Sequence, residues 1–185
     1  MMKYIIYVMN IYEIQAKLKN YNTPVFTTND ITRISGLKKT SAIVSIKRMI
    51  DKQLIFRIAK GYYSISDDPI LYATYIVPNS YISFNTALYL HRVIDQIPTT
   101  ITVAVPKRIK KQVPGVAFIK LPKNGFQGYK SMQYAGYSIW VASIEKAYAD
   151  IAYKFGQTQK IVDNIHYKKF KKYLDVMKIS REIYK

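Results

Sequence analysis

The sequence predicts an α+β protein in two parts: helices with a short hairpin in residues 1–67, and a small mixed α/β domain in residues 68–185. Three observations support this fold class. Apolar residues recur at helical spacing in several segments, and two short stretches alternate as strands around Lys60-Gly61. The sequence Asp67-Asp68-Pro69 then interrupts both patterns. Because proline disfavours helix in the residue before it and breaks a strand ladder, we place the domain boundary there.

Two helices are predicted at the start of the chain. The first covers Ile11 to Asn20, and the residues before it suggest an extra strand, a helical turn or an overhang ahead of a start at Met9. The sequence leaves the start open between Met1, Met2 and Met9. Thr28 is the predicted cap of a second, short helix. Gly36 is expected to end that helix in the left-handed conformation, which glycine adopts without strain.

A longer helix follows, predicted from Ser41 to Lys52 and capped by Thr40. The stripe that we expect to be buried consists of Ala42, Ile46, Met49 and the polar Gln53. Ile43 and Ile50 are expected to widen it toward the core. The sequences LIFRIA and YYSI then form the hairpin. A helix, a turn, a longer helix and a hairpin between Val25 and Ser66 predict a winged helix-turn-helix, in which the longer helix enters the DNA major groove.

The outer side of this longer helix carries side chains suited to DNA. The predicted base contacts are Ser41, Ser45 and Arg48, since arginine can bond guanine in two places and hydroxyls bond several bases. Contacts to phosphates or groove edges are predicted for six further residues: Lys38, Lys39, Thr40, Lys47, Arg57 and Lys60. The alternative is an ordinary solvated helix face.

The second part alternates helices and strands. The expected helices are Pro69 to Tyr75, a helix capped by Ser83 and reaching Val93, a helix capped by Ser143 over Ile144 to Phe155 and ended by Gly156, and Gln159 to Val176. The expected strands are Thr100 to Val105, Val116 to Leu121, Phe126 to Tyr134 and Tyr137 to Val141. A turn is expected at Val77 to Ser80.

Composition indicates a polyanion-binding protein of a reducing compartment. The chain has 29 basic and 11 acidic residues, a net charge of +18, and such a field attracts polyanions in general. Lysine-rich surfaces also serve solubility, which is the alternative. Cysteine is absent, which excludes disulfides and thiolate metal sites. No apolar run is long enough to span a membrane, so we expect a cytoplasmic protein.

Catalytic residues are few, and we expect no enzymatic activity, cofactor or metal. His91 and His166 lie on different predicted helices, and histidines in such positions are usually structural. The alternative is a metal-dependent nuclease, for which the sequence offers the right residue types without the expected spacing: Asp95, Glu145, Lys146 and Asp150.

Aromatic and basic residues are also interleaved in the second part. Three tyrosines around Lys130 suggest a stacking platform for single-stranded nucleic acid, or simply half-buried strand residues: Tyr129, Tyr134 and Tyr137. The C-terminal lysines predict a basic amphipathic helix that rests its aromatic residues on the domain or holds DNA phosphates: Lys168, Lys169, Lys171 and Lys172 around Phe170 and Tyr173.

In order along most of its length, the chain resembles the AbiEi-like antitoxins of type IV toxin–antitoxin (abortive infection) systems. The resemblance includes the segment RIAKGYYSI, the Asp68-Pro69 junction and the stretch SYISFNTALYLHRVIDQIPTTITVAV. It continues in VASIEKAYADIAYKF near the C-terminal helices. The tracts from Tyr81 to Pro98 and from Ala142 to Tyr153 are its more specific parts.

This resemblance implies a transcriptional autoregulator whose N-terminal domain binds inverted-repeat operator DNA at its own promoter. It implies that the C-terminal domain counteracts a nucleotidyltransferase-like toxin, without assuming a stable complex with it. A single winged domain reads one half-site, so a homodimer or cooperative binding on DNA is expected. The alternative is a protein-interaction module that neutralises a toxin or another acidic partner directly.

Overall fold

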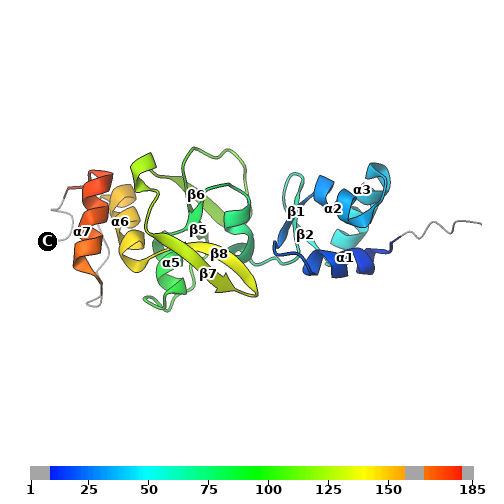
Figure 1. Ribbon diagram of the computed structural model, residues 1–185, viewed down its shortest axis with the longest axis horizontal. Coiled ribbons are helices and arrows are strands. Elements are labelled where there is room, and N and C mark those ends of the chain that lie inside the picture. Colours follow the sequence, from blue (N-terminus) through cyan, green and yellow to red (C-terminus); the bar gives the residue numbers. More distant parts are fainter. Residues whose placement is uncertain (1–8, 157–164, 181–185) are drawn as a thin grey trace, which may run out of the picture. The chain divides into compact units, whose positions relative to one another are not determined.

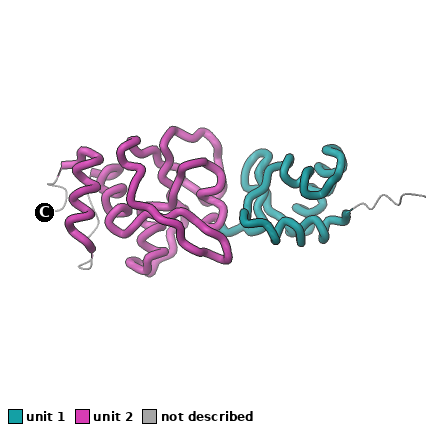
Figure 2. Tube along the Cα trace, in the orientation of Figure 1, with its two compact units in different colours: residues 1–68 teal, residues 69–185 magenta. Residues whose placement is uncertain are grey.

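The computed structural model describes residues 9–156 and 165–180, and its helices and two sheets confirm the α+β class (Figure 1). The chain divides into two compact units, Met1–Asp68 and Pro69–Lys185 (Figure 2). These are called unit 1 and unit 2 below. The division falls immediately before Pro69, where the acidic pair and the proline interrupt the apolar pattern.

The first two helices of unit 1 begin with strong side-chain caps. Helix α1 (Ile11–Lys19) starts at Asn10, and helix α2 (Thr28–Ser35) starts at Thr27. In each, the cap side chain bonds a backbone N–H of the first turn, and an acid three residues on bonds the cap's own N–H. The cap is therefore one residue earlier than the predicted Thr28. Thr27 has Asp30 three residues later, and the two side chains form a reciprocal capping box. The expected left-handed Gly36, at φ 67°, does end α2.

Helix α3 (Lys39–Asp51) starts and ends earlier than predicted. Its cap residue is Lys38 rather than Thr40, and no side chain bonds the free N–H groups there. The buried stripe contains Ala42, Ile46 and Met49, as expected. Gln53 is not part of it, since it follows the helix with φ 55° and is exposed. Ile43 was also wrongly assigned to the core and is 50% exposed, because each residue turns about 100° around the helix axis from the one before it.

A small antiparallel sheet completes unit 1. Strands β2 (Phe56–Ala59) and β3 (Tyr62–Ser64) form the predicted hairpin, with Gly61 at φ 75° in its turn. Strand β1 (Val25–Thr27) pairs with β3 and was not predicted, although its β-branched and aromatic residues favour a strand. The core joins the sheet to all three helices: Ile14, Leu18, Phe26, Ile31, Ile34, Ile46, Met49 and Ile55.

Unit 2 is built on a mixed five-stranded sheet of order β6-β5-β4-β8-β7. The strands are β4 (Tyr81–Ile82), β5 (Ile101–Val105), β6 (Val116–Lys120), β7 (Tyr129–Tyr134) and β8 (Tyr137–Ala142). The β4–β8 and β5–β6 pairs are parallel, and the other two pairs are antiparallel. The central strand β4 was missed in the sequence because its two residues are too few to show alternation.

The helices of unit 2 follow the predicted order with shorter limits. They are α4 (Pro69–Tyr72), the 3₁₀ turns η1 (Ala73–Tyr75) and η2 (Lys123–Gly125), α5 (Phe84–Leu90), α6 (Ile144–Phe155) and α7 (Tyr167–Met177). Helix α5 ends before the predicted Val93, and α7 begins at Tyr167, with residues 157–164 of the predicted helix outside the described residues. Ser143 and Gly156 bound α6 as expected.

A buried ion pair links several of these elements. Lys146 and Asp150 lie one turn apart on α6, are both fully buried and contact each other directly. The Asp150 carboxylate also accepts hydrogen bonds from the hydroxyls of Ser83 at 2.6 Å and Tyr81 at 3.1 Å. The Lys146 ammonium reaches Met177 Sδ of α7 at 3.4 Å. Burial lowers the pKa of Lys146 and raises the pKa of Asp150, and the attraction between the two charges opposes both changes.

We expect Thr27→Ala to lower the free energy of unfolding of unit 1 by about 1 kcal/mol at neutral pH. Burial alone would raise the pKa of Asp30, but bonds from the Thr27 hydroxyl and amide, with the Arg33 charge, hold that pKa below its ordinary 3.8. The stabilisation is therefore complete above about pH 4 and is lost as the pH falls through the lowered value. Hydrogen exchange of the α2 amides measures this loss of stability, and the loss caused by Thr27→Ala should be smaller in acid. If Thr28→Ala lowers the stability as much as Thr27→Ala does, Thr27 is not the cap.

Lys146→Met should destabilise unit 2 by roughly 3–5 kcal/mol, because it leaves the Asp150 carboxylate buried without its counter-charge. Adding Asp150→Asn should recover part of the loss, since the amide oxygen still accepts bonds from Ser83 and Tyr81. Trp140, the single tryptophan, lies in β8 and reports the unfolding of unit 2 in urea. A double variant less stable than Lys146→Met would show that the charge pair is not the cause.

Candidate nucleic-acid interface

The outer face of α3 displays most of the residues predicted to contact DNA. Eight of those nine residues are exposed, and Ser45 is half-buried. Helical spacing centres the exposed face on Thr40, Val44 and Lys47, with Ser41 and Arg48 along one side. Ser45 lies at the margin of this face, next to the buried stripe, and is the least accessible of the predicted base contacts.

Apolar and acidic residues also lie on the outer side of α3. Ile43 and Val44 are each 50% exposed, beside cations rather than in the core. Aliphatic groups in such a position can contact the methyl group of thymine. Asp51, in the last turn, is exposed on the same face and would repel phosphates. The part of α3 suited to a polyanion is therefore its first three turns.

The start of α3 differs from the starts of α1 and α2. Those helices have a side-chain cap and an acid in the first turn, which opposes the positive end of the helix dipole. Helix α3 has neither, and instead places Lys38 and Lys39 at its positive end. Such an arrangement costs helix stability unless an anion occupies the free N–H groups, which is the geometry of a phosphate site.

The hairpin adds two exposed cations to unit 1. Arg57 is on β2, at an edge of the three-stranded sheet, and Lys60 is in the turn. Tyr63, opposite Arg57 in the register, packs against the core of unit 1. Arg57 and Lys60 are both exposed and therefore accessible to a ligand.

Of the predicted nuclease residues, Lys146 and Asp150 contact each other, but both are fully buried and form an internal ion pair. Within residues 9–156 and 165–180, no group of three or more His, Asp or Glu side chains is placed to hold a metal ion. Glu145 accepts bonds from the Ser143 hydroxyl and the His166 amide; these lower its pKa against the opposing effect of burial. His91 bonds the Ala142 carbonyl through Nε2 at 2.8 Å. Asp95 is exposed on the loop after α5.

The suggested tyrosine platform is not formed. Tyr129 stacks on Tyr81, with ring centroids 4.5 Å apart, and meets Trp140 edge to face. Tyr134 pairs with Tyr137 at the opposite end of the β7–β8 hairpin. Since side chains alternate along a strand, Tyr129 and Tyr134 point to opposite faces of the sheet.

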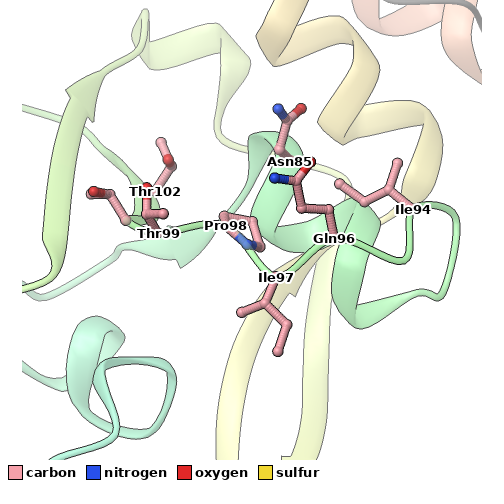
Figure 3. Close-up of a pocket in the computed structure, with 8 residues that line it drawn as sticks. Asn85, Ile94, Gln96, Ile97, Pro98, Thr99 and Thr102 are labelled. Atoms are coloured by element: carbon pink, nitrogen blue, oxygen red, sulfur yellow. The ribbon is translucent and has the colours of Figure 1, made fainter.

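A cavity of about 310 Å³ lies beside residues 94–102 of unit 2 (Figure 3). Its lining contains amides, hydroxyls and apolar groups, and no charged side chain: Asn85, Ile94, Gln96, Ile97, Pro98, Thr99, Thr100 and Thr102. A neutral lining in a chain of charge +18 does not favour a polyanion at this position.

Helix α7 is amphipathic, as predicted. Phe170, Leu174 and Met177 are buried, and the four predicted lysines are exposed. Tyr173 is half-buried, and its hydroxyl packs against Gly128. The lysines give α7 an exposed cationic face, on which Lys171 Nζ lies 5.2 Å from the centroid of the Tyr167 ring.

The chain shows no significant match to known protein families or to functionally characterised proteins. Among the described residues, no helix has both the length and the apolar character needed to cross a membrane. The functional assignment therefore rests on the geometry and charge of the chain's own residues, and on the resemblance described for its sequence.

Proposed function

We propose that unit 1 is a winged helix-turn-helix domain that binds double-stranded DNA, with α3 as the recognition helix. In this proposal α2, the Gly36 turn and α3 form the helix-turn-helix, and the β2–β3 hairpin is the wing. Arg48 and Ser41 would contact bases, Val44 would contact a thymine methyl group, and the lysines would contact phosphates.

The observation that carries this proposal is the uncapped, cationic start of α3 beside an accessible polar face. Local rules of helix stability are followed in α1 and α2 and broken in α3, and such conflicts are expected where a residue serves a ligand. A DNA phosphate at this position would satisfy the free N–H groups and the charges of Lys38 and Lys39 together.

For the whole chain we propose an operon-repressing antitoxin of the AbiEi-like type. Unit 1 would repress transcription at inverted repeats, as a dimer or as a cooperative pair. Unit 2 would counteract a nucleotidyltransferase-like toxin, and this part of the proposal depends on the sequence resemblance.

Arg48→Ala should weaken binding to the operator by roughly 1–3 kcal/mol and relax the preference for one base pair. Lys39→Ala should instead weaken binding to all DNA sequences alike and lower the salt dependence by about one counterion. Fluorescence anisotropy measures both changes in affinity, with the DNA upstream of the gene and with random DNA of equal length.

Lys19→Ala is the matched control, because it removes one exposed cation from α1 of the same unit. We expect it to have less effect than Lys39→Ala on either DNA. If Arg48→Ala lowers binding to operator and random DNA equally, α3 is not the recognition helix.

The two activities should separate between the units. Arg48→Ala should weaken repression of a reporter fused to the chain's own promoter, while the variant still protects cells that express the neighbouring toxin gene. Growth curves and reporter activity in the same cells test this. Loss of protection at normal protein abundance would contradict the separation, and co-purification with the toxin at high salt would favour direct neutralisation instead.

A further inference from the structure

Unit 2 contains a second cavity, of about 490 Å³, between the edge strand β7 and helix α7. Residues 128–132 of the strand form one wall, and Lys169 and Tyr173 of α7 contribute another. His91 and the end of β8 complete it. Its volume lies in the range of pockets that hold small ligands.

The wall formed by β7 offers peptide groups as well as side chains. The Ser143 amide donates to the Gly128 carbonyl at 2.8 Å, so these two residues form a hydrogen-bonded pair in the β7–β8 ladder. Such pairs alternate along antiparallel strands. The N–H and C=O groups of Tyr129 and Ser131 therefore point away from β8, toward the open edge of the sheet. Both residues line the cavity.

The cavity is closed at one end by Tyr173. Gly128 has φ 77°, and a Cβ atom on it would lie 2.4 Å from the Tyr173 hydroxyl. Tyr173 therefore covers the sheet at Gly128, and a ligand that lies in the cavity against residues 129–132 meets this ring at one end.

The charged groups that line the cavity are cationic. Lys130 and Lys169 are exposed lining residues, and no acidic side chain lines the cavity with them. Glu145 lies outside this lining; burial raises its pKa, but its hydrogen bonds, including those from Ser143 and His166, and the Lys169 charge hold that pKa below its ordinary value. Because a carbonyl can only accept, His91 donates through Nε2 to Ala142 and keeps its Nδ1 for another partner.

We infer that this cavity, defined by Lys130, Lys169, Tyr173 and the edge of β7 that no other described strand covers, binds a nucleoside phosphate. The two ammonium groups suit the phosphate, as point charges that can each donate several bonds. The free peptide groups of Tyr129 and Ser131 suit the edge of a base, beside the apolar surface of Met132 and Val141. The inference does not depend on DNA binding by unit 1.

The test is a titration of the full chain with a fluorescent ATP analogue. Lys169→Gln and Lys130→Gln should each weaken binding about tenfold, since each removes a charge-assisted bond. Lys168→Gln is the matched control, because it removes the same charge from the neighbouring position of α7, outside the cavity. We expect less than about a twofold change in affinity for Lys168→Gln.

Competitors identify the source of the phosphate. Displacement of the analogue by free nucleotides, and not by the nucleoside alone, supports a soluble nucleotide. Displacement only by oligonucleotides with a terminal phosphate supports a nucleic-acid end. The inference is overturned if no analogue binds at millimolar concentration, if Lys168→Gln and Lys169→Gln weaken binding equally, or if only an acidic peptide competes.

Discussion

The constraint behind the whole structure is that the chain cannot neutralise its own charge. Even if each of the 11 acidic residues paired with a basic one, 18 cations would remain without an internal counter-charge. Desolvating such a charge is costly, and the one buried lysine of the described residues, Lys146, has Asp150 beside it. Both units therefore present cations to solvent, and positive charge by itself does not locate a binding site.

Local signals in the sequence were enough to place most elements. The acid–proline boundary, the glycines that end α2 and α6, and the alternation around Lys60-Gly61 act within a few residues, and the structure has each element close to its predicted position. The errors in α3 are also local. Thr40 does not cap the helix as expected, and α3 begins at Lys39 rather than at Ser41. It also ends before Gln53, which was expected on its buried stripe.

Features that depend on contacts between distant segments could not be predicted in this way. The strand β4 has two residues and is defined by its neighbours β5 and β8. Ser83 was predicted as a side-chain cap, yet its hydroxyl bonds Asp150, which is 67 positions later in the sequence. The cavity beside β7 likewise needs Gly128 and Tyr173 to meet, and no pattern within either segment indicates that contact.

Shape, rather than charge, distinguishes the two candidate sites. A helix such as α3 presents an open, convex face, along which a long polyanion can lie without obstruction. The cavity beside β7 is also lined by exposed lysines, Lys130 and Lys169, but Tyr173 lies against Gly128 at one end and limits the length of a ligand there. Long-range attraction brings any polyanion to either surface and weakens with salt. In the two proposals, short-range contacts decide which ligand each surface retains: base edges at Arg48, and the peptide groups of Tyr129 and Ser131.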